Sequence, residues 1–333
     1  MSRRATISDV AAAAQVSRAA VSKVLQNAYG VSEDMRRRVN AAIKDLDYRP
    51  LVSARGLRGA TFTIGITIPD YRNHFFNEII RGASEYLADT TYQLLISPVD
   101  PKHLEGYRAI EALHDRQVDG VLTISPMVST TWLERMALRG PIVQLGRHDV
   151  PENYDVVRGD DESGARAVMQ HLLAQGHQRI AHTAQVDAVS EGRDTTPPAI
   201  RRSVYEQCMR DAGLAQHINV IESRYQEMAT YEATLEAFRQ GPVPTAVFAG
   251  NDDAALGVLR VAAEFDAPIA VCGYDDSAIA SHPLIDLTSV NQHGDQMGRL
   301  AMELLLQRVD GRRTPQVKVM DSVLVVRGST VSR

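Results

Sequence analysis

The stretch TISDVAAAAQVSRAAVSKVL, residues 6–25, predicts how the N-terminal part of the chain folds. Thr6 is a capping residue and precedes a run of strong helix formers, so a first helix is expected over about residues 7–14. Ser17 can cap a second helix, expected over residues 18–26, because its hydroxyl can accept a hydrogen bond from an amide of the first turn. Two short helices joined by so tight a turn are typical of a helix-turn-helix unit.

A third helix is expected after residue 31. Ser32, Glu33 and Asp34 are typical of a helix start, because the positive end of the helix dipole stabilises acidic side chains in the first turn. Apolar residues at helical spacing form stripes that can pack together. These stripes consist of Ala20, Val21, Val24 and Leu25 on the second helix and of Met35, Val39, Ala42, Ile43 and Leu46 on the third. The first fifty residues therefore predict a small all-α domain.

Charge distinguishes this N-terminal segment from the rest of the chain. The 333 residues carry a formal net charge of -5. Residues 1–60 contain eleven Lys or Arg and five Asp or Glu, a balance of +6, which leaves -11 for the remainder. A basic segment favours a polyanionic partner, because neutralising phosphates supplies most sequence-independent affinity for nucleic acid. A solubilising basic arm would explain the charge equally well, but the helical periodicity argues against a disordered arm.

The second helix of the pair is the one that a DNA major groove would admit. Arg18 can donate two hydrogen bonds to a guanine, and Ala19 can contact a thymine methyl group. Ser22 and Lys23 can reach a phosphate or a base. Each of these residues alone fits a solvated helix face, but together, on a helix-turn-helix unit, they favour DNA binding.

Residues 6–50 resemble the DNA-binding headpiece of the LacI/GalR family of bacterial transcription regulators. The resemblance is carried by Asp9-Val10-Ala11, Val16-Ser17, Val21-Ser22, Val31-Ser32, the run Arg36-Arg37-Arg38-Val39, and Tyr48-Arg49-Pro50. The chain departs from the family pattern at Gln15 (usually glycine), Ala20 (threonine), Lys23 (arginine) and Leu51 (asparagine). The resemblance implies that double-stranded operator DNA is contacted by Thr6, Ser17, Arg18, Ala19, Ser22, Lys23, Asn27, Tyr48, Ala54 and Leu57.

Residues 51–60 are expected to form a hinge. They are too few for a stable isolated helix, because helix nucleation is costly, and Gly56 weakens a helix further. The family resemblance implies that the hinges of two subunits become helical on operator DNA. It also implies that Leu57 wedges between base pairs in the minor groove with Ala54 packed beside it, and apolar wedges of this kind kink DNA.

From Phe62 onward, short β-rich apolar runs alternate with amphipathic helical ones, which predicts βα units around parallel sheets. The alternation restarts near residue 160, so two doubly wound lobes are expected. This part resembles the periplasmic-binding-protein-like core of the same family. The expected division is a headpiece over 1–50, a hinge over 51–60 and an α/β core over 61–333, with an N-lobe of about 61–158 and 291–315 and a C-lobe of about 159–290 and 316–330.

Polar residues follow several expected strands, and ligands of open parallel sheets bind at the carboxyl ends of strands. Such side chains can instead cap the helices that follow. The resemblance implies an effector between the lobes, most often a sugar. It assigns this effector to Asp70, Asn73, Phe75, Phe76, Arg147, Arg201, Tyr225, Asn251, Asp275 and Gln292. Gly146 replaces a common acidic residue and Pro197 falls near a common serine, so an atypical effector is expected.

Enzymes are the main rival class, but no phosphate loop GxxxxGK[ST], HExxH, GxSxG or GxGxxG motif is present. The adjacent carboxylates Asp160-Asp161 and Asp275-Asp276 do not indicate paired catalytic geometry. Cys208 and Cys272 lie far apart in sequence without CxxC spacing, which predicts neither a disulfide nor a zinc site. No enzymatic activity, cofactor or metal is therefore expected.

No apolar run reaches the length of a membrane span, and residues 1–14 lack a signal core, so a cytoplasmic protein is expected. A periplasmic sugar-binding protein would fit residues 61–333 alone, but the absent export signal and the basic headpiece oppose it. The final residues lack the leucine heptads that would join dimers. The sequence predicts a homodimeric repressor that reads a pseudo-palindromic site, and it leaves open whether the effector induces or corepresses.

Overall fold

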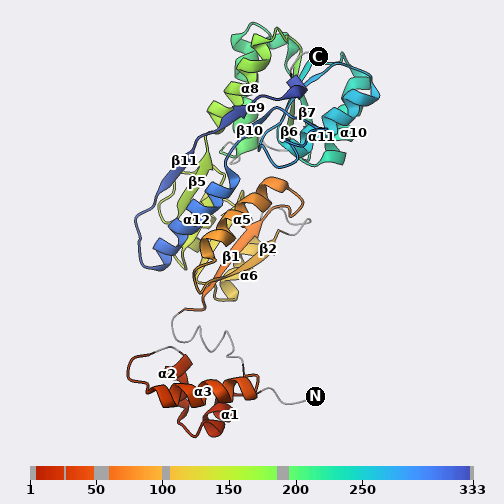
Figure 1. Cartoon of the computed structure of the whole chain (residues 1–333). Helices are drawn as coiled ribbons and strands as arrows, with labels where there is room; N and C mark the ends of the chain where they lie inside the picture. The colour runs from red at the N-terminus through yellow and green to blue at the C-terminus, as the bar shows by residue number, and fades with distance from the viewer. Residues whose placement is uncertain (1–4, 26–27, 49–59, 100–105, 186–194, 331–333) are drawn as a thin grey trace. The chain divides into compact units, whose positions relative to one another are not determined.

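The computed structural model describes residues 5–25, 28–48, 60–99, 106–185 and 195–330 (Figure 1). The expected contacts Asn27, Ala54 and Leu57, and most of the hinge, lie outside these residues. The chain divides into two compact units, Met1–Thr61 and Phe62–Arg333. Each unit is described by itself below.

The first unit contains three helices: α1 (Ile7–Ala13), α2 (Arg18–Leu25) and α3 (Glu33–Asp45). The predicted helix-turn-helix and the third helix are therefore confirmed. In the turn between α1 and α2, Gln15 has a φ of 53°, a left-handed conformation that favours glycine. The departure at Gln15 therefore keeps the backbone conformation that the usual glycine would adopt most easily.

The three predicted caps each hold a helix start. Thr6 and Asp9 form a reciprocal capping box at α1. The hydroxyl of Ser17 accepts a hydrogen bond from the amide of Ala20 at 3.1 Å, and Ser32 caps α3 in the same way. These bonds satisfy amides that have no partner within their own helix, and each such cap is worth about 1 kcal/mol.

The interior of this unit is small and apolar. Its buried residues are Val10, Ala11, Ala14, Val21, Val24, Val39 and Ala42, with Met35, Ile43 and Tyr48 packed against them. Three expected packing residues do not join this core: Leu25 is 39% exposed, Leu46 is 37% exposed, and Ala20 is half-buried. Leu25 and Leu46 lie at the C-terminal ends of their helices, where the stripe has already rotated away from the neighbouring helices.

The second unit begins with a lobe built on a six-stranded parallel sheet in the order β11-β5-β4-β3-β1-β2, and we call it the first lobe. Its strands are β1 (Thr63–Ile68), β2 (Gln93–Pro98), β3 (Gly120–Ile124), β4 (Ile142–Leu145), β5 (Asp155–Gly159) and β11 (Val317–Met320). Its helices are α5 (His74–Leu87), α6 (Tyr107–Asp115), α7 (Thr130–Ala137) and α12 (Gly294–Val309). One apolar cluster lies between the sheet and α5 with α12, and another lies between the sheet and α6 with α7.

A second lobe is built on a four-stranded parallel sheet in the order β7-β6-β8-β9. Its strands are β6 (Ile180–Gln185), β7 (Asn219–Ser223), β8 (Ala246–Ala249) and β9 (Ala270–Cys272). Its helices are α8 (Asp161–Ala174), α9 (Pro197–Asp211), α10 (Glu227–Gln240) and α11 (Asp252–Glu264), with short 3-10 turns at Ala215–His217 and Gly328–Thr330. Apolar clusters fill both faces of this sheet, so the predicted pair of doubly wound lobes is confirmed.

The C-terminal segment corrects one expected boundary. Residues 316–330 are expected in the C-lobe, but β11 pairs in parallel with β5 of the first lobe. A separate strand, β12 (Val323–Val325), pairs antiparallel with β10 (Ser289–Asn291). The prediction was wrong here because the valine-rich run shows β propensity but not where its hydrogen-bonding partner lies.

The packing of α5 against α12 positions one wall of the site described below (Figure 1). A Cβ at Gly298 would lie 2.0 Å from the carbonyl oxygen of Ile79, and one at Gly82 would lie 1.9 Å from that of Asp295. Only glycine permits so close an approach of the two backbones. The two helices therefore form a rigid pair whose N-terminal ends lie at the same end of the first lobe.

Candidate functional site

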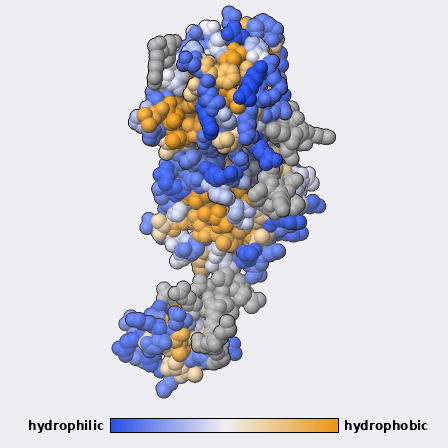
Figure 2. Space-filling model, turned by 90° about the vertical axis from the view of Figure 1, so that its right-hand side faces the viewer, coloured by the Kyte–Doolittle hydropathy of each residue, from blue (hydrophilic) through white to orange (hydrophobic). Residues whose placement is uncertain are grey.

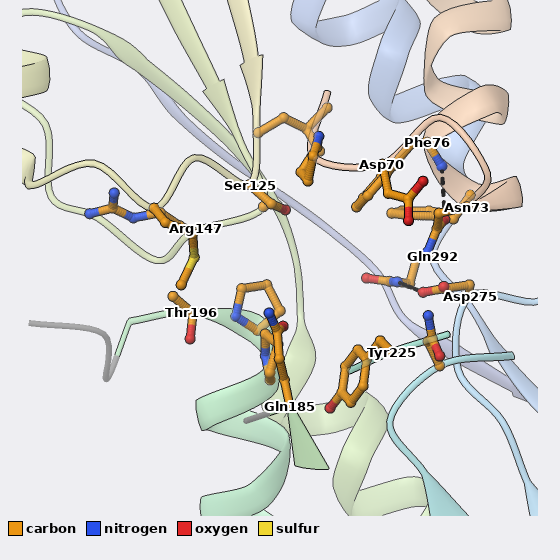
Figure 3. A pocket seen from close by; sticks show the side chains of 18 of the residues that line it. Asp70, Asn73, Phe76, Ser125, Arg147, Gln185, Thr196, Tyr225, Asp275 and Gln292 are labelled. Carbon is orange, nitrogen blue, oxygen red and sulfur yellow. Dashed lines mark hydrogen bonds between the residues drawn. The ribbon is translucent and has the colours of Figure 1, made fainter. Parts of the chain in front are cut away.

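The second unit contains a cavity of about 690 Å³ between its two lobes (Figure 3). All ten residues assigned to an effector by resemblance line this cavity: Asp70, Asn73, Phe75, Phe76, Arg147, Arg201, Tyr225, Asn251, Asp275 and Gln292. They come from strand ends and helix starts of both lobes, as expected for open parallel sheets. The structure brings them together, and their role in ligand binding remains a prediction.

Arg201 of α9 is the central cation of the second-lobe wall. Its guanidinium lies 2.8 Å from Asp161 and donates a hydrogen bond of 2.8 Å to the carbonyl oxygen of Gly250. Its carbon Cζ lies 3.5 Å from the centre of the Tyr274 ring, a cation–π distance. Arg201 is only 5% exposed, so these contacts fix its side chain in a single position.

Asp275 lies beyond β9 and is buried. It accepts a hydrogen bond of 2.7 Å from the amide of Gln292. Burial raises the pKa of Asp275 well above its usual range, with the nearby carboxylate of Asp252 adding to the shift and Arg201 opposing it. Its φ of 111° is rare for any residue except glycine. Backbone strain of this kind is concentrated at functional sites, so the fold holds this carboxyl group in place at an energetic cost.

Asn251 and Asn73 each serve as a helix cap, which is the alternative role considered for these polar residues. The side-chain oxygen of Asn251 accepts a hydrogen bond of 2.8 Å from the amide of Ala254 at the start of α11. Asn73 caps α5 through the amide of Phe76 at 3.2 Å. An asparagine that caps through its oxygen still has two N–H donors. Both residues can therefore cap a helix and also face a ligand.

Among the polar contacts that join the lobes are those of Asp70 and His74. The amide of Gln226 in the second lobe donates to the carboxylate of Asp70 in the first lobe at 3.1 Å. Asp70 also pairs with Arg72 at 2.9 Å, and these partners hold the pKa of Asp70 below its usual value although burial alone would raise it. His74 of α5 lies 3.4 Å from Asp253 of α11. These contacts connect elements whose separation would change if the lobes moved apart.

Arg147 lines the cavity in a different way. Its guanidinium donates to Asp149, to the hydroxyl of Thr130 and to the carbonyl oxygens of Pro126 and Val128. All five of its N–H donors are engaged by these partners. Figure 3 shows the head of Arg147 turned away from the other labelled side chains. It therefore borders the cavity with its aliphatic stem.

Asp161 is a site residue that the sequence did not predict. It is buried at the start of α8, where it pairs with Arg201 and lies 2.8 Å from Nε2 of His148. Burial alone would raise the pKa of Asp161, but Arg201 and His148 outweigh it and hold the pKa below its usual value. The doublet Asp160-Asp161 was visible in the sequence, yet its spacing gave no sign that Arg201 would lie beside it.

Tyr225 forms part of the cavity floor, and its ring explains the glycine opposite. A Cβ at Gly250 would lie 2.0 Å from the Tyr225 hydroxyl oxygen. Burial raises the pKa of Tyr225 above its usual value, so the hydroxyl stays protonated at neutral pH. Further lining residues that the sequence did not predict are Ser125, Met127, Leu145, Gln185, Thr196, Pro198 and Met297.

In the first unit, the expected DNA contacts fall into three groups. Arg18, Ala19 and Lys23 are exposed along α2. The side chains of Thr6 and Ser17 cap helices. Ser22 and Tyr48 are half-buried. The structure thus presents the start of α2 to solvent, as direct readout by this helix would require.

Comparison with known proteins gives two family matches. The family model for bacterial regulatory proteins, lacI family, matches residues 6–50, and a periplasmic binding protein-like domain matches residues 169–330. The ribose operon repressor of Escherichia coli (strain K12) is 32% identical over 339 residues, covering 98% of this chain and 99% of the relative. The chain belongs to the LacI family of bacterial regulatory proteins. The HTH-type transcriptional regulator CelR of Thermobifida fusca is also 32% identical, covering 98% of each chain.

Solved structures confirm the fold of this LacI-family protein. A CelR–cellobiose complex is 28% identical with a TM-score of 0.69, covering 98% of this chain and 100% of that one. A lac repressor dimer bound to operator has a TM-score of 0.80 over 99% and 100% of the two chains, and at 24% identity it bears on the fold alone. The predicted headpiece, the two-lobed core and the prediction of a DNA-binding transcription regulator are confirmed.

Two properties that the sequence raised can also be examined in the described part of the chain. Cys208 and Cys272 are both buried and unpaired. Among the described residues, no helix has the length and apolar character to cross a bilayer. In that same part of the chain, no group of three or more His, Cys, Asp or Glu residues could hold a metal ion.

Proposed function

We propose that this LacI-family protein is a homodimeric repressor whose affinity for a pseudo-palindromic operator is set by a small carbohydrate bound between the lobes. The observation that carries this proposal is the gathering of Asp275, Gln292, Asn251 and Arg201 at one cavity. Carboxyl, amide and guanidinium groups supply both acceptors and donors for the vicinal hydroxyls of a sugar. A ribose operon repressor and a CelR–cellobiose complex among its relatives support this choice of ligand.

Control of DNA binding requires that the ligand prefer one arrangement of the lobes, because a ligand with equal affinity for two states shifts nothing. The contacts Gln226–Asp70 and His74–Asp253 cross between the lobes and depend on their separation. A ligand that touches Arg201 and Asn73 would also contact both lobes. We expect the coupling between ligand and DNA to be about 1–3 kcal/mol, the usual range for allosteric proteins.

A homodimer is supported by the surface of the first lobe. Figure 2 shows hydrophobic residues gathered in patches on the surface of the core. The edge strand β2 carries Ile96, which is 43% exposed. An exposed strand edge with apolar side chains favours association, and two-fold dimers are the commonest closed arrangement. A dimer would also present two headpieces to the two halves of a symmetric DNA site.

The test is selection of binding sites for the full-length protein from a random pool of double-stranded DNA. We expect a two-fold symmetric sequence to be enriched, and its affinity to fall steeply as salt rises. Arg18→Ala should weaken binding to the selected site at least fivefold, since a bidentate base contact is worth about 1–3 kcal/mol. The matched control is Arg239→Ala on α10, an exposed arginine outside the headpiece.

The same assay tests control by a ligand. A panel of sugars is titrated into the complex with the selected DNA, and one of them should change DNA affinity at least fivefold. If no site is enriched, the proposed sequence-specific DNA binding is contradicted. It is also contradicted if Arg18→Ala binds the selected site as tightly as the wild type does. If none of the sugars changes the affinity for DNA, control by a carbohydrate is contradicted.

A further inference from the structure

The two ends of the cavity differ in chemistry. Asp275, Gln292, Asn73 and Asp70 lie together at one end in Figure 3, and Thr196 lies at the other. Beside Thr196, Ser125 and Gly146, the lining includes apolar side chains: Met127, Leu145, Pro197 and Pro198. We call these four residues the apolar end. Hydroxyl recognition accounts for the first end but not for the second.

Polar side chains are few near the apolar end, where Ser125 and Thr196 add only hydroxyl groups to the lining. Gly146 has no side chain, and a Cβ there would lie 2.8 Å from Oγ of Ser125 and 3.9 Å from Cγ of Pro197. Arg147 gives all of its donors to its own lobe. Pro197 occupies the first turn of α9, where it offers a ring and no N–H group. A hydroxylated ring placed here would lose hydrogen bonds to water and gain few in return.

The volume of the cavity exceeds the needs of one sugar ring. At about 30 Å³ per water molecule, the 690 Å³ would hold about 23 waters. A hexose has about a dozen non-hydrogen atoms. A single ring at the Asp275 end would therefore leave roughly half of the space unfilled, which is room for a further group on the sugar.

The charges of the cavity oppose an anionic ligand. Three of its arginines have carboxylate partners, namely Arg72 with Asp70, Arg147 with Asp149 and Arg201 with Asp161. Only the last two of these pairs are buried, and Arg224, which also lines the cavity, is exposed. A phosphate or carboxylate group that engaged Arg147 or Arg201 would have to compete with a buried ion pair, and separating such a pair is strongly unfavourable.

We propose that the ligand is an uncharged sugar that carries one apolar, ring-sized substituent. The sugar ring contacts Asp275, Gln292 and Asn251, and the substituent packs against Met127 and Pro197. This inference rests on the proposed carbohydrate-controlled function and narrows it. Glycosides with an aromatic substituent and nucleosides share this chemistry, and the experiment below distinguishes them.

The test uses matched probes and the full-length protein. Thermal shift first finds which sugar binds, among the methyl and phenyl glycosides of D-glucose, D-galactose, D-xylose and D-ribose together with uridine and adenosine. Calorimetry then gives Kd for the methyl form, the phenyl or nucleoside form and the phosphate ester of that sugar. We expect the ring-bearing form to bind at least tenfold more tightly than the methyl form, because it buries a ring against the apolar end. The phosphate ester should bind at least tenfold more weakly than the methyl form.

Two variants locate the preference. Met127→Gln should reduce the ratio of phenyl-form to methyl-form affinity at least fivefold, because it places an amide where the ring packs. Asp275→Asn should weaken both forms by similar factors, since both carry the sugar ring. The matched control for methionine is Met228→Gln, an exposed methionine on α10 outside the cavity lining, which should change neither affinity.

The outcomes separate this inference from the function on which it rests. If methyl and ring-bearing forms bind equally, the apolar end is not a binding subsite, whereas carbohydrate control stands. If the phosphate ester binds more tightly than the methyl form, the proposal that the ligand is uncharged is overturned, whereas the apolar substituent stands. If no sugar in any form binds or alters DNA affinity, the proposed function fails and this inference fails with it. Preference for uridine or adenosine over phenyl riboside identifies the substituent as a base, and the reverse identifies an aromatic glycoside.

Discussion

Two buried arginines, one on each side of the cavity, show how the same residue type can serve different purposes. Arg147 is 3% exposed and Arg201 is 5% exposed. The partners of Arg147 all lie within residues 126–149 of the first lobe. Those of Arg201 lie at the start of α8, at the end of β8 and, through Gln292, beyond β10. Arg147 therefore stabilises one lobe, whereas Arg201 connects β8 of the second lobe with Asp161 and Gln292, which lie where the chain passes between the lobes.

The carboxylates that these two arginines bind also differ in their other partners. Asp149 is bound by Arg147, by the hydroxyl of Tyr154 at 2.8 Å and by Thr195 at 3.2 Å, and it has no contact with the polar end of the cavity. Asp161 is shared between Arg201 and His148. A ligand that bound the guanidinium of Arg201 would alter its ion pair with Asp161. It would therefore also alter the contact between Asp161 and His148. Burial of an arginine beside a cavity is therefore insufficient to identify a ligand contact.

The largest effect is expected from Arg201→Met. The substitution leaves Asp161 buried with His148 alone, and removing one partner of a buried ion pair costs about 3–5 kcal/mol. Urea unfolding should show a loss of this size in the free energy of unfolding, and sugar binding should become undetectable. Arg202→Met is the matched control, because Arg202 neighbours Arg201 on α9 but pairs with Glu206 and Glu222 at the surface. Its cost should stay near 1 kcal/mol or less. Normal sugar affinity in Arg201→Met would remove the distinction between the two arginines.

Arg147→Met sharpens the comparison from the other side. It leaves the buried Asp149 with two hydroxyl partners and frees two carbonyl oxygens, so a loss of about 2–4 kcal/mol in unfolding free energy is expected. The Kd for sugar, measured on the folded protein at low temperature, should change less than the Kd of Arg201→Met does. A loss of sugar affinity as large as that of Arg201→Met, at equal stability, would show that Arg147 turns toward the ligand when one is bound.

Sequence reasoning succeeded where the deciding interaction is local or topological. The caps at Thr6, Ser17 and Ser32 depend on residues three positions away, and each formed as predicted. The ten cavity residues were assigned by the family resemblance, and the rule that ligands bind at the carboxyl ends of parallel strands supports only those that follow strands, such as Asp70 and Asn251. Side-chain direction at Arg147, by contrast, depends on a loop twenty residues earlier in the chain. The pairing of β11 with β5 likewise depends on a partner more than 150 residues away, and local patterns carry no record of such partners.

The smallest expected effect is the pH dependence that the buried carboxylate Asp252, on the second-lobe side, gives to the unfolding free energy. Asp149 has an arginine partner, whereas Asp252, behind Asp275, is held by the amide and hydroxyl of Ser277 and by Ser289. Burial raises the pKa of Asp252 to about 7, and the hydrogen bonds from the two serines only partly oppose this. The folded protein therefore takes up a proton that the unfolded chain, with a pKa near 3.9, releases.

A raised pKa in the folded state stabilises the protein below the unfolded value, and this stability is lost as pH rises toward the folded value. The unfolding free energy of the wild type, relative to Asp252→Asn, should thus fall by about 2 kcal/mol between pH 5 and pH 7. Urea unfolding of both proteins at the two pH values measures this difference directly. Asparagine does not titrate, so the variant subtracts the ionisable groups that do not interact with Asp252, and the change that it causes at its neighbour Asp275 is part of the measured difference. If the difference between the two proteins stays constant with pH, Asp252 is ionised at both pH values. Ser277 and Ser289 would then stabilise a buried carboxylate in the second lobe as well as Arg147 stabilises Asp149 in the first lobe.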